Sequence, residues 1–140
     1  MELNAAKIPT MYFIGVSTGQ SSSKNIFPKW AETLGISPAK LVGIDLKIHD
    51  EPENYQRVVS FIKNDPLSLG ALITTHKMDL MHACQDEFDA IDPLASELGE
   101  VSSIYKRNSK LMARATDPEG GGLALRNFLP LDYFSESEAE

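Results

Sequence analysis

Three short apolar runs, each followed by polar residues and a helical pattern, limit what this chain can fold into. The first run, residues 10–16, is almost continuously apolar and lies between Pro9 and a serine-rich loop. Residues 41–46 and 69–74 form the second and third runs. Runs of this kind are typical of strands buried on both faces, and strands that alternate with helices form parallel sheets. An α/β fold is therefore expected.

Helical patterns separate and follow these runs. Asn25 is the expected N-cap of a helix over residues 26–34, and Gly35 is its expected stop. The apolar residues of this helix at helical spacing are Ile26, Phe27, Trp30 and Leu34. Residues 52–64 predict an amphipathic helix, because Pro52 suits the first turn and four apolar residues form a stripe. Residues 77–84 predict a third, shorter helix.

The second half of the chain predicts a different connection. Residues 92–98 predict a short helix closed by Gly99. Residues 101–105 and 111–115 predict a strand pair, joined by a turn at Asn108-Ser109. A last helix is expected from Asp117 onward. The complete order predicts a three-layer α/β sandwich, in which helices flank a mostly parallel sheet with one antiparallel strand.

Length and charge narrow the function. A chain of 140 residues is expected to form one domain, over residues 1–130, and residues 131–140 are expected to be an acidic tail or an interdomain linker. The net charge of −7 disfavours nucleic acid as a partner. No apolar run approaches the roughly 20 residues that span a bilayer, and the N-terminus lacks a secretory pattern. Neither a membrane partner nor export is expected, and cytoplasm is the expected compartment.

Polar residues that follow the strands are the candidates for a binding site, because ligands of open α/β sheets bind at the carboxyl ends of strands. Lys77 follows the third run closely and could serve as a general acid or base, or could simply lie on a surface helix. Asp117 could bind a ligand and hold Lys77 charged, or could be only a helix N-cap. Residues 21–23, all serine, could bind a carboxylate or form a flexible loop.

Other chemistry is disfavoured. His49, His76 and His82 lack the spacing of a metal site. Residues 120–122 are all glycine, but they lack the register of a nucleotide-binding loop. Cys84 is expected to be a small buried residue. No metal and no cofactor are expected on this chain.

Over residues 12–125, four motifs in series resemble the substrate-binding domain of the shikimate and quinate dehydrogenases. They are a strand with a Ser-x-Ser loop, a strand that leads to a lysine, an Ile-Gly-Ala-Val-Asn-Thr-like stretch, and an Asn-Thr-Asp-x-x-Gly-like stretch. The residues that match or stand at ligand positions are Gly15, Ser21, Ser23, Lys77, Ser102, Thr116, Asp117 and Gly120. The chain departs from the family at Ala71 and Ile73, where the family has Asn and Thr, and at Ser102, where it has Asn.

The resemblance implies a role for each matching residue. Lys77 would be the general acid/base and Asp117 its partner. Ser21 and Ser23 would hold the substrate carboxylate, and Ser102 and Thr116 would contact the substrate. Hydride transfer in this family uses NADP or NAD, held by a Rossmann-type domain that this chain lacks.

The implied substrate is a cyclic hydroxy acid related to shikimate or quinate, in aromatic amino acid biosynthesis. The apolar residues at positions 71 and 73 are expected to favour a ligand with fewer hydroxyls. The implied partners are this small molecule, a Rossmann-type domain in cis or in trans, and a second copy in a homodimer. Two alternatives stay open: a stand-alone, non-catalytic module that binds a small carboxylate, and a degenerate domain kept for an interface.

Overall fold

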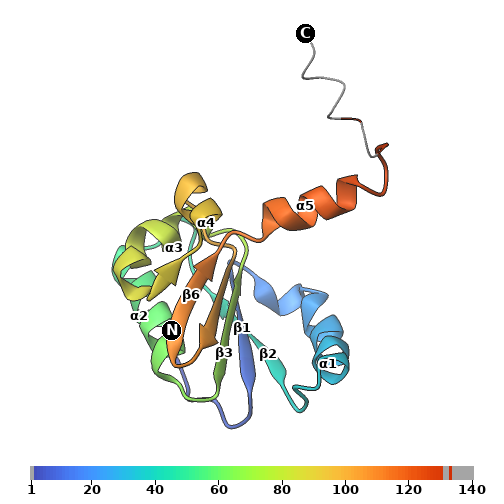
Figure 1. Cartoon of the computed structure of the whole chain (residues 1–140). Helices are drawn as coiled ribbons and strands as arrows, with labels where there is room; N and C mark the ends of the chain where they lie inside the picture. Colours follow the sequence, from blue (N-terminus) through green and yellow to red (C-terminus); the bar gives the residue numbers. More distant parts are fainter. Residues whose placement is uncertain (1, 131–132, 134–140) are drawn as a thin grey trace.

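The computed structural model describes residues 2–130 and residue 133, and it is built around one six-stranded sheet (Figure 1). The strands run in the order β2-β1-β3-β5-β6-β4. Their bounds are β1 Thr10–Gly15, β2 Lys40–Asp45, β3 Ser68–Ile73, β4 Ala90–Ile91, β5 Ser103–Arg107 and β6 Lys110–Arg114. Only β5 pairs antiparallel with its neighbours, and the other described pairs are parallel. The predicted mostly parallel sheet with one antiparallel strand is confirmed.

Helices lie on both faces of this sheet. The α-helices are α1 Ser23–Thr33, α2 Pro52–Asn64, α3 Lys77–Cys84, α4 Pro93–Leu98 and α5 Asp117–Leu125, and two 3-10 turns, Thr18–Gln20 and Gln85–Glu87, lie between them. Figure 1 shows α2 and α3 on one side of the sheet and α1 on the other, while α5 projects away from it. The predicted three-layer arrangement is therefore confirmed.

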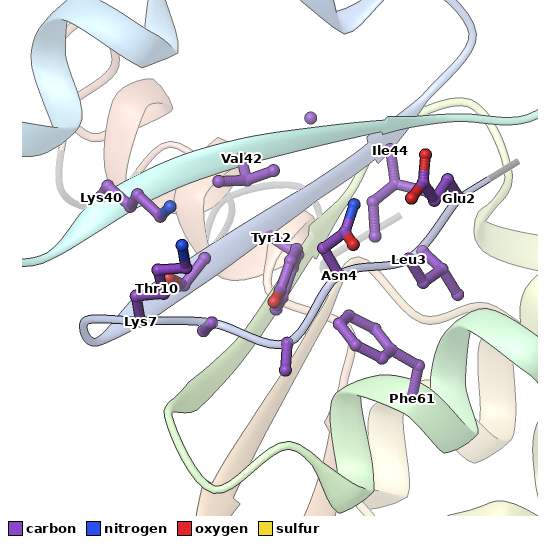
Figure 2. A pocket seen from close by; sticks show the side chains of 13 residues that line it. Glu2, Leu3, Asn4, Lys7, Thr10, Tyr12, Lys40, Val42, Ile44 and Phe61 are labelled. Carbon is purple, nitrogen blue, oxygen red and sulfur yellow. The ribbon is translucent and has the colours of Figure 1, made fainter.

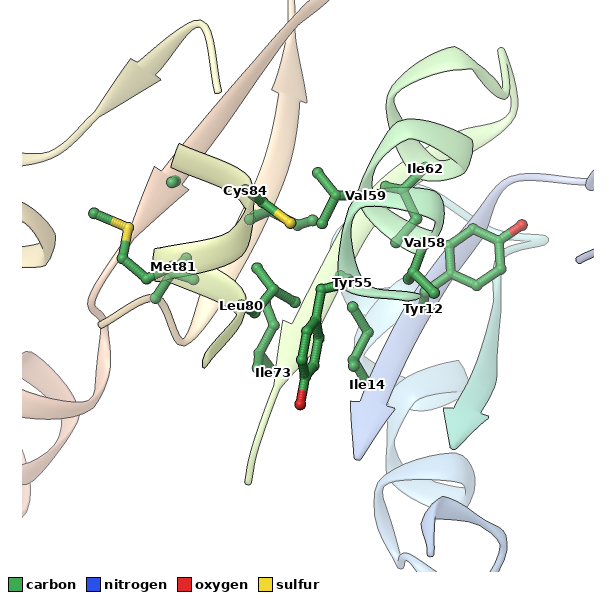
Figure 3. Close-up of a cluster of buried hydrophobic side chains, with 14 of the residues drawn as sticks. Tyr12, Ile14, Tyr55, Val58, Val59, Ile62, Ile73, Leu80, Met81 and Cys84 are labelled. Atoms are coloured by element: carbon green, nitrogen blue, oxygen red, sulfur yellow. The ribbon is translucent and has the colours of Figure 1, made fainter. Parts of the chain in front are cut away.

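The main core fills the space between the sheet and α2 with α3. Helix α2 begins at Pro52, and its stripe of Tyr55, Val58, Val59 and Ile62 is fully buried. Figure 3 shows these side chains against Ile14 of β1, Ile73 of β3 and Leu80 of α3. Burying apolar side chains of this size stabilises the fold by about 1.5–3 kcal/mol each. This core fixes the positions of β1 and β3, and so of the loops that follow these strands.

Helix α1 differs from the expectation. It begins at Ser23, with Ser22 as N-cap, so Asn25 lies inside the helix rather than capping it. Gly35 ends it as predicted, with φ +68°. The apolar stripe is not a core face, because Trp30 is 57% exposed and only Ala31 is buried. Phe27 and Trp30 do face the sheet, but a cavity of about 180 Å³ lies between them and the strands, so the helix does not pack closely there.

The strand pair of the second half was predicted two residues too early for its first strand. Its turn was predicted correctly: Asn108 and Ser109 have φ of +52° and +61°, the left-handed region that two-residue hairpin turns require. Strand β4 was missed, since two residues carry no periodic signal. Within the described part of the chain, no helix has the length and apolar character needed to cross a membrane. The acidic tail predicted over residues 131–140 falls almost wholly outside the described residues.

Candidate functional site

Five of the six strands end at one edge of the sheet. Strands β1, β2 and β3 are mutually parallel, β6 runs in the same direction because β5 is antiparallel to both β3 and β6, and β4 is parallel to β6. The loops that leave this edge carry Ser21 after β1, Lys77 after β3, and Thr116 with Asp117 after β6. The topology thus brings together residues that are far apart in the sequence.

Lys77 and Asp117 form an ion pair at this edge, through Lys77 Nζ and Asp117 Oδ2. Lys77 is the first residue of α3, and Asp117 is the first residue of α5, where a carboxylate also interacts favourably with the helix dipole. The N-cap of α5 is Thr116, so the carboxylate of Asp117 is not used as a cap. The side chains are 26% and 51% exposed, which leaves the pair open to a ligand.

Ser102 follows Val101, whose N–H donates to the carbonyl of Lys77, and it is fully buried. Its Oγ accepts a hydrogen bond from the backbone N–H of Thr116 at 2.7 Å and shares another with Thr116 Oγ1 at 3.0 Å. The hydroxyl is therefore engaged within the protein. In this arrangement Ser102 holds the segment that leads into α5, and through it the backbone next to Asp117.

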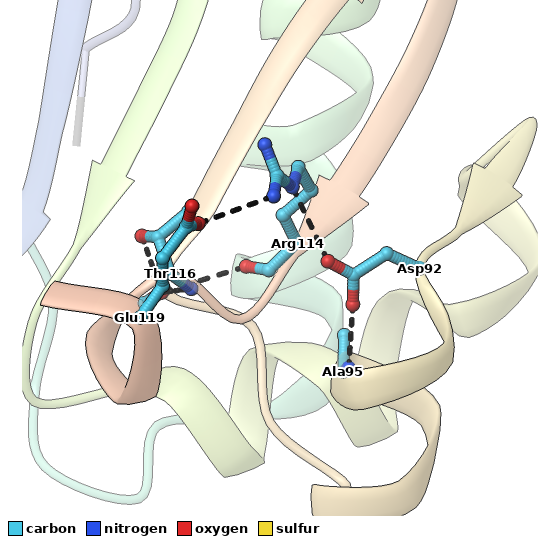
Figure 4. Close-up of polar contacts among 6 residues, drawn as sticks. Asp92, Ala95, Arg114, Thr116 and Glu119 are labelled. Carbon is cyan, nitrogen blue, oxygen red and sulfur yellow. Dashed lines mark hydrogen bonds and ion pairs between the residues drawn. The ribbon is translucent and has the colours of Figure 1, made fainter. Parts of the chain in front are cut away.

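Arg114, at the end of β6, joins two helix starts (Figure 4). Its Nε donates to Asp92 Oδ2 at 3.2 Å, and its Nη2 donates to Glu119 Oε2 at 3.3 Å. Asp92 also caps α4 by accepting from the N–H of Ala95 at 2.6 Å. Sequence reasoning missed Arg114. The available signal was a cation at the end of a strand, between an N-cap carboxylate and an acidic first helical turn.

The two serines of the loop after β1 point to different places. Ser21 lines a cavity of about 280 Å³ beside Gly15, Thr74 and Thr75, and its Oγ accepts the N–H of Ser23 at 3.2 Å. Ser23 is instead the first residue of α1, and it lines a separate, almost wholly apolar cavity of about 180 Å³. The structure therefore brings Ser21 to the strand edge with the loop after β3, and does not place both serines on one cavity.

Asp45 fixes this loop to the end of β2. Its Oδ1 accepts the backbone N–H of Thr18 at 2.8 Å and the Thr18 hydroxyl at 2.6 Å, and these hydrogen bonds lower the pKa of Asp45. Gly43 permits the contact, because a Cβ there would lie 2.0 Å from Thr18 Oγ1. Sequence reasoning missed Asp45, although a carboxylate that ends an apolar strand was a visible signal.

Ala71 and Ile73 lie in the core rather than at the candidate site. They are 0% and 1% exposed, and both belong to the cluster under α2 and α3. The expectation that they make the ligand site more apolar does not fit this placement. Compared with the resembled family, these two positions thus lack polar side chains, but neither residue lines an open surface.

His76, beside Lys77, is also buried. Its Nδ1 lies 3.1 Å from the hydroxyl of Tyr55, and its Nε2 has no hydrogen-bond partner within the described structure. Burial raises the pKa of Tyr55. Burial also raises the pKa of the Cys84 thiol to about 12, as expected for an inert buried cysteine. Among residues 2–130 and 133, no group of three His, Cys, Asp or Glu side chains is placed to hold a metal ion.

No protein-family model matches this sequence, and no curated protein is significantly similar to it. Solved structures do match. A shikimate dehydrogenase in complex with NADP+ is 25% identical, with a TM-score of 0.70, over 86% of this chain and 39% of its own. The shikimate 5-dehydrogenase of Thermus thermophilus, solved with NADP(H) and shikimate, is 21% identical, with a TM-score of 0.66, over 89% and 44%.

A 5-ketofructose reductase of Gluconobacter sp. strain CHM43 matches to a similar extent, at 18% identity and a TM-score of 0.69, over 88% of this chain and 41% of its own. The chain thus spans less than half the length of each of these three proteins. Such coverage agrees with one domain of a two-domain enzyme. The matches confirm the resemblance seen in the motifs: this chain has the shikimate dehydrogenase fold, over the extent expected for the substrate-binding domain.

Proposed function

We propose that this chain is the substrate-binding part of a shikimate dehydrogenase-like oxidoreductase that acts on a cyclic hydroxy acid. The ion pair of Lys77 and Asp117 is the observation that carries the proposal. Two residues 40 positions apart meet at the carboxyl edge of the sheet, where ligands of open α/β sheets bind. Both remain partly open to solvent, as groups that must reach a substrate require.

The chemistry of the pair suits the oxidation of an alcohol. The amine of Lys77 would accept the proton of the substrate hydroxyl, and in the reverse direction its ammonium would donate that proton to the carbonyl oxygen. Asp117 would orient Lys77 and accept a hydrogen bond from the same hydroxyl. Ser21 would bind the carboxylate, and Ser23 would join it only if the first turn of α1 moved toward Ser21. Thr116 would contact the ring hydroxyls, with Ser102 behind it.

NADP or NAD would take up the hydride from the substrate. A Rossmann-type domain, in cis or in trans, would hold this cofactor. The glycine-rich stretch of this chain does not fit the phosphates of a nucleotide. Residues 120–122, the glycine-rich stretch of the chain, are helical within α5 rather than a loop whose N–H groups could cradle phosphates. The proposal therefore assigns only substrate binding and proton transfer to this chain.

The alternative proposal is a module that binds a small carboxylate without catalysis. The buried, fully engaged hydroxyl of Ser102 favours it, because a position that contacts substrate in the resembled family is here used for internal support. A degenerate domain kept for an interface remains a third candidate, and it predicts no ligand at all.

Titration with shikimate and quinate, followed by the amide signals in NMR spectra, tests these proposals. We expect saturable shifts around residues 15–21, 74–77 and 116–119. Lys77→Ala and Asp117→Asn should each weaken binding about tenfold or more, because each removes a charged hydrogen-bonding group. Lys110→Ala, at the exposed hairpin end of β6, is the matched control and should bind like the unmodified chain.

The outcomes separate the candidates. If the Lys77 and Asp117 variants bind as tightly as the unmodified chain, the proposed site is wrong. If neither shikimate nor quinate shifts any amide signal, the third candidate, a domain kept for an interface, is favoured. If both variants lose affinity, adding a purified Rossmann-type partner domain with NADP or NAD and following absorbance at the nicotinamide band decides between enzyme and binding module.

A further inference from the structure

A second cavity lies away from the candidate site and extends from the starts of β1 and β2 to Ile44, near the end of β2 (Figure 2). It has a volume of about 380 Å³, within the roughly 300–1,000 Å³ of small-molecule sites. Its walls are the N-terminal segment of residues 2–7, the edge strand β2 with its neighbour β1, and Phe61 of α2. Thr10 and Lys40, which begin β1 and β2, lie at its rim, whereas Lys77 follows the end of β3.

The N-terminal segment is a fixed wall of this cavity. The backbone N–H of Ala6 donates to Asp65 Oδ2 at 2.8 Å, and the N–H of Lys40 donates to the carbonyl of Pro9 at 3.1 Å. The first contact ties Ala6 to the end of α2, and the second ties Pro9, which follows the segment, to the edge strand β2. The wall of the cavity is therefore anchored at its Ala6 end.

The floor of the cavity is apolar and partly aromatic. Val42 and Ile44 contribute aliphatic surface, and the rings of Tyr12 and Phe61 meet edge to face, with centroids 5.5 Å apart. The hydroxyl of Tyr12 already donates to Asp65 Oδ2 at 3.2 Å. Tyr12 therefore offers an occupant its ring rather than its hydroxyl, so the floor suits an apolar body of ring size.

The charge of the rim is uneven. Figure 2 shows Lys7 and Lys40 at the end where the strands begin, and Glu2 at the opposite end beside Ile44. Five ion pairs are formed among the residues that the structure describes, and neither lysine takes part in them. Two cations outside these pairs converge on one end of a cavity in a chain whose net charge is −7. That end is complementary to an anion.

We propose that this cavity binds a small monoanion with an apolar, ring-sized body, such as an aromatic carboxylate. The carboxylate would lie between Lys7 and Lys40, and the ring would rest on Tyr12, Val42 and Phe61. The site does not depend on the proposed function, because it shares no residue with the edge that carries Lys77 and Asp117. It gives the chain a second place at which a small acid can act.

Three probes of similar size test the charge: benzoate, benzyl alcohol and benzylamine. Titrating each into the full chain and following amide signals by NMR should give saturable shifts in residues 3–7 and 40–44. We expect benzoate to bind at least about tenfold more tightly than benzylamine, with benzyl alcohol between them. Equal affinity for benzoate and benzylamine, or no shift in those segments up to millimolar benzoate, would overturn the proposal.

Two sets of variants test the location. Lys7→Gln with Lys40→Gln should weaken benzoate binding about tenfold, while Lys29→Gln with Lys110→Gln removes the same charge from exposed positions elsewhere and should leave it unchanged. Ala5→Phe, on the N-terminal segment, should fill part of the cavity and also weaken binding. Circular dichroism confirms that each variant is folded. An unchanged affinity in the first double variant contradicts the site.

Discussion

Asp65 shows how one buried carboxylate can organise a terminus. Its oxygens accept the N–H groups of Ala6 and Leu67 and the hydroxyl of Tyr12. Burial by itself would raise the pKa of Asp65, but these hydrogen bonds outweigh it and hold the pKa below its ordinary value. The charged form of Asp65 is thus the one that the fold stabilises.

A pH dependence follows from the lowered pKa of Asp65. Such a group contributes stability above its unfolded pKa of about 4, and this contribution is lost as the pH falls through the folded pKa. We expect Asp65→Asn to lower the free energy of unfolding by about 1–2 kcal/mol at pH 7, and the difference from the unmodified chain to narrow below about pH 4. Urea denaturation followed by circular dichroism at pH 7 and pH 3 measures both values.

Asp86→Asn is the matched control, because Asp86 is an exposed carboxylate in the turn after α3. It should change the free energy of unfolding by less than about 0.5 kcal/mol at either pH. If Asp65→Asn is destabilising by the same amount at pH 7 and pH 3, the loss comes from packing and the charge argument is wrong.

Ser102 carries the second prediction at this scale. Replacing it by Ala leaves the partly buried N–H of Thr116 without its acceptor, and a lost acceptor of this kind typically costs about 1–3 kcal/mol. We expect Ser102→Ala to reduce the free energy of unfolding by that amount and to speed hydrogen exchange in α5. Ser103→Ala changes the next residue, the first of β5, for which the described structure shows no side-chain hydrogen bond, and should have neither effect. Equal effects of the two variants would contradict the supporting role.

Sequence reasoning placed Ser102 near the site but could not give the direction of its hydroxyl. A motif states which residue stands at a position, and the register of β5 against β6 decides where that residue points. The same limit applies to Ser23, which sequence reasoning put in a binding loop and which the structure puts in the first turn of α1. The pairing of Lys77 with Asp117 was easier to foresee, because both residues begin helices that follow strands ending at one edge.

At the scale of elements, α1 and α2 show what an amphipathic pattern does and does not predict. The pattern gave α2 its observed bounds, Pro52–Asn64, because Pro52 marks its start and its four apolar positions are all buried. The apolar residues at helical spacing in α1 predicted the helix, but most of them stay exposed in the structure. Periodicity states that one face is apolar, but only the packing of other elements decides whether that face is covered.

A pair of truncations tests this difference between the helices. Ile62→Ala in α2 removes a fully buried side chain and should lower the free energy of unfolding by about 2–5 kcal/mol. Leu34→Ala removes a side chain of similar size that is 71% exposed, at the end of α1, and should change it by less than about 0.5 kcal/mol. Chemical denaturation of both variants under the same conditions gives the two values. A large loss in Leu34→Ala would mean that α1 packs into a core.

For the whole molecule, the alternation of strands and helices predicted a largely parallel sheet, and the hairpin near the end of the chain predicted its antiparallel strand. It did not predict the order of the strands, because a crossover leaves no mark in the local sequence. Strand β4 was missed for a related reason: its two residues pair with β6 only in the folded chain. The order of the strands depends on such long-range pairing, which the local sequence does not encode.

The topology places the two ligand sites that we propose at opposite edges of one sheet, Lys77 after the end of β3 and Lys40 at the start of β2. Sites that are well separated and share no partners contribute additively. We expect Lys77→Ala to leave benzoate binding at residues 3–7 and 40–44 unchanged within about twofold. Conversely, Lys7→Gln with Lys40→Gln should leave the shikimate response of residues 74–77 unchanged.

Both halves of this exchange can be measured in one set of NMR titrations, since each site reports through its own amides. Benzoate is itself a carboxylate, so it can also reach the edge with Ser21 and Lys77, and the positions of the shifted signals distinguish the two events. If either set of lysine variants abolishes both responses, the chain has one acid site with a distant reporter. That result would contradict the proposal of two separate sites. The single site would then be the one that contains the lysines whose replacement abolished both responses.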